Sequence, residues 1–474
     1  MKSIKRAMLA TSLLGCLSAQ AGTESTVDTN AATSSPSTAT GLLVGKLTGE
    51  TAYDKIWSAF TLYKDDSNPI LQEFSLQGRL QVQTADGHSD NGHFDMQDYK
   101  NPDKFGNNSK DEAVWGDHIE ARRAYFGAKT KWFQNWKVEG QIDVDTDGLD
   151  GKGPDRTLYK DIYDLYVVYA PSDAMNIGAG KQEIKFTREQ EISSKEILTF
   201  ERSLVTNMLH PGNLTGGWVS GKGIDEHWLY ELAVYGNDQV REFSNFDGGA
   251  ITFGKIGYDY SSQSGLDSAI ATFRYMHNSR PGFQSSETDS NYTAPKNPLF
   301  SDSIALTNDI IQGRFGLTTD VLYGFGYEGS AKQVNSLTNN WEPKSLNQKD
   351  VFGINIIPSY FIADGLQLVG RFQWAVSEDA DAKHGTVPAT SNLAIQGRYE
   401  KSAPAVIQNG DQYVSAYVGL NYYLYGNKLK LMTGVEFSAL GGGLPVAEKV
   451  ADKKTAQTAS YDGYTFMSGL RMSF

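Results

Sequence analysis

The most regular feature of the chain is an alternation of apolar and polar side chains from about residue 70 to the end. In one run, Leu429, Leu431 and Phe437 alternate with Lys430 and Glu436. Side chains two positions apart lie on the same face of a β-strand, so each such run has one apolar and one polar face. The pattern therefore predicts an all-β fold.

The spacing of these runs indicates which kind of β-protein this is. Short links such as 133–135 and 425–427 alternate with long, polar links such as 85–117 and 378–411. A soluble sandwich would also show alternating strands, but tight turns at one end and long loops at the other are typical of a transmembrane barrel. Sixteen candidate strands are 72–84, 118–132, 136–146, 160–170, 174–185, 214–223, 227–236, 249–260, 266–277, 302–311, 315–328, 351–362, 366–377, 412–424, 428–439 and 462–474.

We therefore predict a transmembrane antiparallel β-barrel of about 16 strands, with short periplasmic turns and long external loops. Hydrocarbon offers no hydrogen-bond partners, so a spanning sheet must close on itself, with its apolar face toward lipid and its polar face toward the lumen. Tyrosines near the predicted strand ends should form aromatic girdles at the two interfaces. These include Tyr166, Tyr258, Tyr422 and Tyr423.

The first 69 residues follow other patterns. Residues 1–21 have a basic start, a short apolar stretch and an Ala-Gln-Ala site, so we expect a signal peptide cleaved after Ala21. Cys16, the only cysteine, would leave with it, although Leu-Leu-Gly-Cys at this point also suits a lipoprotein site. Residues 22–50 read as a flexible linker rich in Ser, Thr and Ala, and 70–474 as the barrel.

Residues 51–69 should contain a short amphipathic helix that packs against the body of the protein. Tyr53, Ile56, Trp57 and Phe60 fall on one face of that helix. A channel occupant, a periplasmic tether and a cap facing lipid are alternative roles for the region before the barrel.

Composition excludes several classes of protein. The chain has 474 residues, with 43 Lys and Arg against 56 Asp and Glu, and this acidic balance disfavours nucleic acid as a partner. It lacks repeated apolar runs of ~18 residues, which a bundle of membrane helices would need. No catalytic motif or metal-ligand spacing is complete, so we expect neither enzymatic activity nor a cofactor or metal.

Three segments resemble a known family. Arg122–Lys129 (RRAYFGAK), Gly178–Gln182 (GAGKQ) and Thr199–Leu204 (TFERSL) are similar to motifs of the phosphate-selective porin O/P family. The resemblance covers roughly 70–474. It implies a trimeric porin in the outer membrane of a Gram-negative bacterium, which passes small hydrophilic solutes. It also implies that the third external loop, here about 186–213, folds into the barrel and narrows it.

The alternation of inward and outward residues along the strands gives one set of candidate site residues, and the third external loop gives another. Fixed cations in a confined channel raise the local anion concentration, which predicts an anion filter that would take phosphate. The pore-lining candidates are Arg79, Arg123, Lys129, Lys137, Arg371, Lys428, Lys430 and Arg471. The constriction candidates are Lys185, Arg188, Lys195 and Arg202.

Acidic residues on the same surfaces leave other functions open. A general porin with loose selectivity is an alternative to the anion filter, because four acids share the predicted lumenal faces: Glu139, Asp143, Asp145 and Glu436. The loop acids could pair with the loop cations and leave a salt-bridged loop without substrate preference; these acids are Glu189, Glu191, Glu196 and Glu201. A structural or adhesive barrel with an occluded lumen and an outer-membrane hydrolase are further alternatives.

Overall fold

The computed structural model describes most of the chain after residue 50. The described residues are 51–89, 113–144, 159–238, 242–246, 249–281, 300–326, 329–334, 341–346, 350–377, 393–394, 409–410, 412–441, 445–450, 453–458 and 461–474. The expected signal peptide with Cys16 and the expected linker lie outside these residues.

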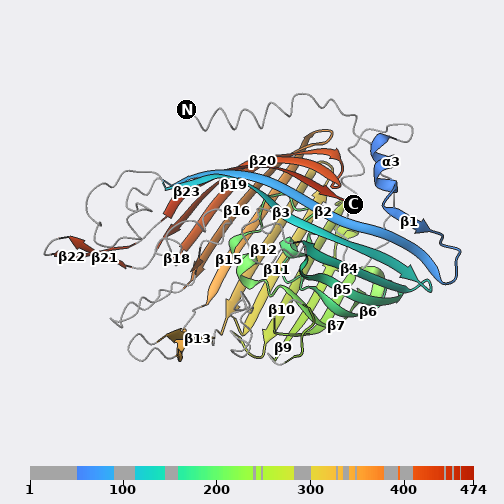
Figure 1. The fold of residues 1–474 in the computed structure, drawn as a ribbon, viewed down its shortest axis with the longest axis horizontal. Coiled ribbons are helices and arrows are strands. Elements are labelled where there is room, and N and C mark those ends of the chain that lie inside the picture. The colour runs from blue at the N-terminus through green and yellow to red at the C-terminus, as the bar shows by residue number, and fades with distance from the viewer. Residues whose placement is uncertain are drawn as a thin grey trace.

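Sixteen strands form a closed antiparallel barrel (Figure 1). Each strand pairs with the next along the chain, and β2 pairs with both β3 and β23, which closes the sheet. The predicted fold class is therefore confirmed. The strands are β2 (Leu71–Ser89), β3 (Ala113–Trp132), β4 (Trp136–Val144), β5 (Tyr159–Ser172), β6 (Met175–Glu183), β7 (Asn213–Lys222), β8 (Trp228–Gly236), β9 (Ala250–Asp259), β10 (Ser268–Asn278), β11 (Asp302–Gln312), β12 (Phe315–Phe325), β15 (Val351–Ala363), β16 (Leu366–Ser377), β19 (Gln412–Tyr425), β20 (Leu429–Gly441) and β23 (Tyr461–Ser473).

Tight turns join the strands at one end of the barrel, which we call the short-turn end. Three of these turns contain glycines in the left-handed region, Gly313 (φ 56°), Gly365 (φ 72°) and Gly426 (φ 51°), where glycine carries no Cβ penalty. Two other links contain a short helix each, α6 (Ser261–Ser264) and the 3-10 helix η4 (Ile224–Glu226).

The links at the opposite, long-loop end contain structure that the sequence did not predict. Strands β2 and β3 continue into the predicted link at 85–117, so the link is shorter than predicted. Small antiparallel pairs occur in three other links that we expected to be loops. These are β13 (Gly329–Val334) with β14 (Trp341–Leu346), β17 (Leu393–Ala394) with β18 (Asn409–Gly410), and β21 (Pro445–Val450) with β22 (Lys453–Thr458).

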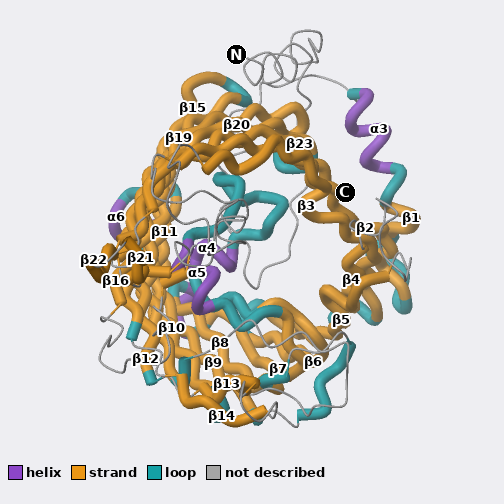
Figure 2. The backbone as a smooth tube through the Cα atoms, turned by 60° about the vertical axis from the view of Figure 1, so that its left-hand side comes forward, coloured by secondary structure: helices purple, strands orange, loops and turns teal. Residues whose placement is uncertain are grey.

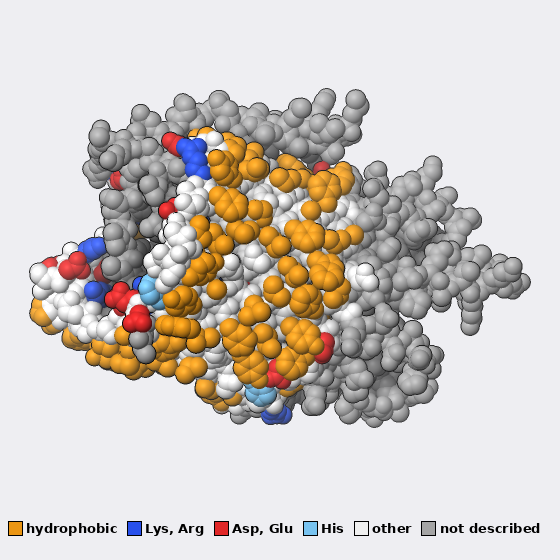
Figure 3. Space-filling view, turned by 180° about the vertical axis from the view of Figure 1, so that it is seen from behind, with side chains coloured by type: hydrophobic (Ala, Val, Ile, Leu, Met, Phe, Trp, Pro, Cys, Tyr) orange, Lys and Arg blue, Asp and Glu red, His pale blue; other side chains and the backbone are white. Residues whose placement is uncertain are grey.

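The barrel is apolar outside and polar inside. On β19 the outward Val418 is 48% exposed, whereas the neighbouring inward residues Ser415 and Asn421 are 2% and 0% exposed. Figure 3 shows hydrophobic side chains over the outer surface in that view, with charged side chains near its edges. A surface of this kind suits hydrocarbon, and the buried polar side chains find partners inside the barrel.

The predicted aromatic girdles are wrong for two tyrosines. The Tyr166 hydroxyl donates to Glu139 Oε2 at 2.8 Å, and the Tyr423 hydroxyl donates to Gln367 Oε1 at 2.6 Å, so both face the interior. Tyr422 does face outward, because adjacent residues of a strand point to opposite faces.

Before the barrel lie one helix and one short strand. Helix α3 (Ala52–Ser58) begins with a capping box in which the Thr51 side chain and Asp54 satisfy each other's backbone N–H groups. Strand β1 (Thr61–Lys64) pairs with the start of β2 and was not predicted. Ile56 is 54% exposed, so its expected place on the packed face of the helix is wrong. None of the helices in the described part of the chain is long and apolar enough to cross a membrane.

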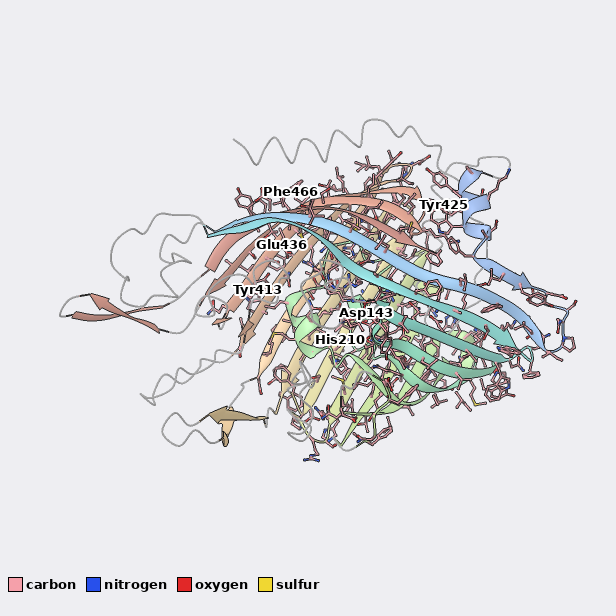
Figure 4. All side chains as sticks on the ribbon, in the orientation of Figure 1. Asp143, His210, Tyr413, Tyr425, Glu436 and Phe466 are labelled. Atoms are coloured by element: carbon pink, nitrogen blue, oxygen red, sulfur yellow. The ribbon has the colours of Figure 1, made fainter. Side chains whose placement is uncertain are left out.

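The segment α3–β1 contacts the barrel where β23 ends. The Trp57 indole N–H donates to the Ser473 carbonyl at 2.6 Å, and the Phe60 ring stacks on the Phe474 ring with centroids 3.9 Å apart. The hydroxyl of Tyr425, the last residue of β19, donates to Asp54 Oδ1 at 2.7 Å (Figure 4). Helix α3 therefore fastens the short-turn end of the last strand.

Candidate functional site

The segment between β6 and β7, residues 184–212, lies inside the ring of strands (Figure 2). We call it the inner loop. It contains two short helices, α4 (Arg188–Glu191) and α5 (Leu204–Leu209). The Thr187 hydroxyl caps α4 by accepting the Gln190 backbone N–H at 3.0 Å. This loop determines which parts of the interior stay accessible to water.

An apolar face of the inner loop packs against part of the inner wall. Phe186 and Leu209 are fully buried in a cluster with the inward side chains of Ile251 and Phe253 on β9 and Leu322 on β12. Each large apolar side chain buried in this way contributes ~1.5–3 kcal/mol. The wall is close enough to α5 that a Cβ added at Gly324 would come within 2.6 Å of Leu209. The loop is thus seated tightly on this side.

Glu191 holds α4 to the wall through two cations of the wall and also contacts one cation of its own helix. Its carboxylate contacts Arg274 of β10 at 2.7 Å, Lys255 of β9 at 3.1 Å and Arg188 of its own helix at 3.1 Å. Burial alone would raise the pKa of Glu191, but Arg274, Lys255 and Arg188 outweigh it and hold the pKa well below its usual value. Glu191 is therefore a fixed negative charge.

Carboxylates on the neighbouring strands β11 and β12 hold the same helix. Arg188 pairs with Asp309 of β11 at 2.9 Å. The backbone N–H groups of Arg188 and Glu189 donate to the Asp320 carboxylate of β12 at 2.9 and 3.2 Å. Glu189 in turn accepts from Arg371 of β16 at 3.5 Å. These contacts position the start of α4.

The middle of the inner loop is attached to the strands around the β2–β23 seam. Glu201 pairs with Arg122 of β3 at 2.5 Å, and Arg471 of β23 donates to the Phe200 carbonyl at 2.9 Å. Burial opposes ionisation of Glu201, yet Arg122 and Arg123 lower its pKa far below the usual range. Ionic contacts therefore anchor the loop on both sides of the barrel.

Most of the predicted pore-lining cations take part in this anchoring. Arg79 donates to the Ser194 hydroxyl, and Lys430 donates to the Ile197 carbonyl at 2.8 Å. Arg371 and Arg471 contact the loop as described above, and Arg123 lies 3.7 Å from Glu201. The structure thus brings five of the eight candidates together around the loop.

The other three predicted pore-lining cations lie away from the loop contacts. Lys129 of β3 pairs with Glu73 of β2 at 3.5 Å, and Lys137 is on the neighbouring strand β4. Lys428 sits in the turn between β19 and β20, with its ammonium 5.7 Å from the centre of the Tyr425 ring. These three cations therefore do not form a single ring around the lumen with the five cations that contact the inner loop.

The four predicted constriction cations divide into two kinds. Arg188 and Arg202 hold the loop together, since Arg202 donates to the carbonyls of Glu189 and Ile192 at 3.1 Å each. Among the residues that the structure describes, the ammonium groups of Lys185 and Lys195 form no ion pair or hydrogen bond. The two lysines are therefore available to a passing solute, and the two arginines are not.

The inner loop covers one side of the lumen more than the other. On the covered side, Arg274 and Asn355 are 0% and 1% exposed. On β3, the Lys129 side chain is 33% exposed, and its partner Glu73 on β2 is 26% exposed. Water therefore reaches the start of β2 and the inward face of β3–β5, which together we call the wall formed by β2–β5; further along β2, Gln77 and Gln81 are 4% and 1% exposed.

Arg79 and Lys195 lie at the border between the loop and this open wall. The Arg79 guanidinium stands over the stacked rings of Tyr125 and Tyr163, 4.9 and 5.6 Å from their centres. Burial and the neighbouring Arg79 charge lower the pKa of Lys195 to about 8, and Glu139 acts in the opposite direction. Positive and negative side chains therefore share this narrow region.

Sequence reasoning missed the wall residues that hold the inner loop. They are Arg122, Lys255, Arg274, Asp309 and Asp320. The alternation along β10 contained a signal for Arg274, since Phe273 and Tyr275 on either side of it face outward. In the described part of the chain, no group of three or more His, Cys, Asp or Glu side chains is placed to hold a metal ion.

Comparison with protein families identifies the group to which these features belong. The family described as phosphate-selective porin O and P matches residues 89–435, which include the inner loop and most of the barrel strands. This chain belongs to that family. It is therefore an outer-membrane porin. No curated protein matches the sequence at a significant level.

Solved structures of other outer-membrane proteins are similar to this porin in fold. OmpT of Vibrio cholerae shares 10% identity, over 87% of this chain and 99% of that chain, with a TM-score of 0.45. The DcaP channel of Acinetobacter baumannii shares 15% identity, over 87% and 100%, with a TM-score of 0.44. OmpF of Salmonella typhi, in complex with daunomycin, shares 12% identity, over 87% and 100%, with a TM-score of 0.48.

Proposed function

We propose that this porin lets small hydrophilic solutes diffuse passively across the outer membrane, along the wall formed by β2–β5, with a weak preference for anions such as phosphate. The observation that carries the proposal is the pair of unpaired ammonium groups, Lys185 and Lys195, on an inner loop whose other cations are neutralised.

The preference is weak because the open region contains charges of both signs. Glu139 and Asp143 on β4 share the region with Lys129 and Arg79. One uncompensated charge at ~4 Å in water contributes ~1 kcal/mol, or about a fivefold preference for the opposite ion. A strong phosphate filter would need several free cations in one place. We propose that phosphate is one of several permeant anions.

Reversal potentials across a planar bilayer test the proposal. In a KCl gradient, the folded porin should give stepwise currents and a reversal potential that favours chloride by about fivefold or less. Lys195→Gln should reduce that preference. Asp173→Asn, at an exposed turn on the short-turn end, is the matched control and should not reduce it. A preference for potassium in the unmodified porin would contradict the anion part of the proposal.

A structural barrel with an occluded lumen is the second candidate, because the inner loop buries much of the interior wall. Absence of current from correctly folded porin would establish it in place of the first. We also infer from the family that three copies assemble, and from the Ala-Gln-Ala site that the mature chain begins after Ala21. Chemical cross-linking in detergent and N-terminal sequencing of the exported protein test these two inferences.

A further inference from the structure

A second hollow lies between the inner loop and the short-turn end of the barrel. It offers ≈ 130 Å³ of space, and none of its lining residues belongs to the open β2–β5 wall. Ile192, Glu196 and Leu198 of the inner loop form one side, and β11, β12, β15, β16 and β19 form the other. That volume is below the ~300–1,000 Å³ of pockets for drug-sized ligands, so the hollow suits a smaller molecule with a single ring.

One part of this hollow is apolar and rigid. The rings of Phe361 and Tyr423 lie with their centres 5.7 Å apart, close to Leu198 and Ile192 in the lining. The Tyr423 hydroxyl is fixed by its 2.6 Å hydrogen bond to Gln367. This surface suits the flat apolar face of a small molecule, since aromatic rings pack well in offset or tilted arrangements.

The remaining part is lined by two cations and two carboxylates, of which only Glu196 has no partner among the described residues. Arg188 and Asp309 neutralise each other at 2.9 Å, and Arg314 pairs with Asp364 at 3.1 Å. The Glu196 carboxylate forms no ion pair or hydrogen bond with another described residue. A ligand that enters the hollow therefore meets one available charge, and it is negative.

Two cations lie near Glu196 without pairing with its carboxylate. One is Lys195, its neighbour in the sequence, and the other is Lys430 on the wall. Lys430 donates to the Ile197 carbonyl at 2.8 Å, and its ammonium lies 5.7 Å from the centre of the Tyr423 ring. Lys195 is half-buried beside Arg79, at the border of the open wall. Both exert some attraction on Glu196, but neither occupies a hydrogen-bonding position on its carboxylate.

We propose that this hollow binds small amphipathic amines, with the ammonium on Glu196 and the apolar face on Phe361 and Tyr423. Such a molecule would pause there on its way through the lumen and interrupt the ion current. The inference goes beyond the proposed anion preference, but it rests on the proposed function in one respect, because the interruption can be seen only in a conducting channel.

The test uses 2-phenylethylammonium as a probe with the full-length porin in a planar bilayer. The expected result is transient interruptions of the open current whose duration is asymmetric between the two sides of the membrane. Two probes of nearly the same shape, neutral 2-phenylethanol and anionic phenylacetate, should interrupt the current at least fivefold more briefly. This comparison needs no variant.

Variants then test whether the interruptions of the current arise at Glu196. Glu196→Gln should shorten the interruptions by 2-phenylethylammonium at least fivefold, whereas Asp173→Asn at an exposed turn should leave them unchanged. Equal interruptions in Glu196→Gln and the unmodified porin, or longer ones with phenylacetate, would overturn the inference. Open current without any interruption would also overturn it and would leave the proposed function standing, whereas absence of open current would count against both.

Discussion

Removal of the Glu191 charge should loosen the inner loop and enlarge the pore. In Glu191→Gln, a neutral amide replaces a carboxylate that contacts Arg274 at 2.7 Å and Lys255 and Arg188 at 3.1 Å each. The amide can still accept hydrogen bonds, but Arg274 loses the carboxylate that it contacts, whereas Arg188 and Lys255 keep Asp309 and Glu231. Arg274 is fully buried and has no water to replace it.

The size of the effect follows from the burial of these groups. Removal of one partner from a buried ion pair costs ~3–5 kcal/mol, because the remaining charge is left uncompensated. At 1.36 kcal/mol per tenfold change, this cost shifts the balance between seated and released loop by ~150- to ~5,000-fold. Helix α5 should stay in place, since Leu209 and its apolar neighbours do not depend on Glu191. The change should therefore be a partial release at α4.

Single-channel recording and liposome swelling measure this release. Glu191→Gln should give larger or fluctuating current steps and should admit larger sugars than the unmodified porin does. Asp173→Asn removes one carboxylate at an exposed turn and is the matched control, with no change expected. If folded Glu191→Gln kept the same conductance and the same sugar limit, the assigned role of this ionic cluster would be wrong.

Three other properties should respond to defined changes. Because Lys195 is charged below its pKa of about 8 and neutral above it, the anion preference should decline as the pH rises from about 7 to about 9, and a flat profile would argue against its role. Trp57→Ala should lower the free energy of unfolding in denaturant titration by ~3–5 kcal/mol. The control Ile56→Ala, at an exposed position of the same helix, should lower it by ~0.5 kcal/mol or less. Equal effects of the two changes would show that α3 does not fasten the barrel. Val418→Arg, on the outward face of β19, should cost ~2–4 kcal/mol in lipid, and a neutral effect there would contradict contact with hydrocarbon.

The strands could be predicted from the sequence because a membrane barrel constrains every second residue. On β19, predicted at 412–424 and observed as Gln412–Tyr425, lipid outside and polar partners inside impose opposite chemistry on adjacent residues. The short hairpins β13–β14 and β21–β22 lie in the long links and lack that constraint. The sequences of these hairpins show no apolar–polar alternation that would distinguish them from loop segments.

The partners of the inner loop could not be predicted in the same way. Its acids were expected to pair with its own cations, but Glu191 and Glu201 pair mainly with Arg274 and Arg122 on the wall. Such contacts join residues far apart in the sequence. The apolar–polar alternation along a strand predicts whether a side chain points inward or outward, but it does not predict how far along the barrel axis the side chain lies. Apolar inward residues on β9, such as Phe253, also break the polar pattern of the lumen because the loop packs on them.

Thiol labelling during current recording tests most directly whether the water path follows the β2–β5 wall. Cys16 is the only cysteine of the sequence, so a mature chain that begins after Ala21 carries one thiol in each of the variants Lys129→Cys and Asn355→Cys. A negatively charged thiol reagent should reduce the current through Lys129→Cys and leave Asn355→Cys, beneath the inner loop, unaffected. Reduction of the current in Asn355→Cys but not in Lys129→Cys would contradict the account.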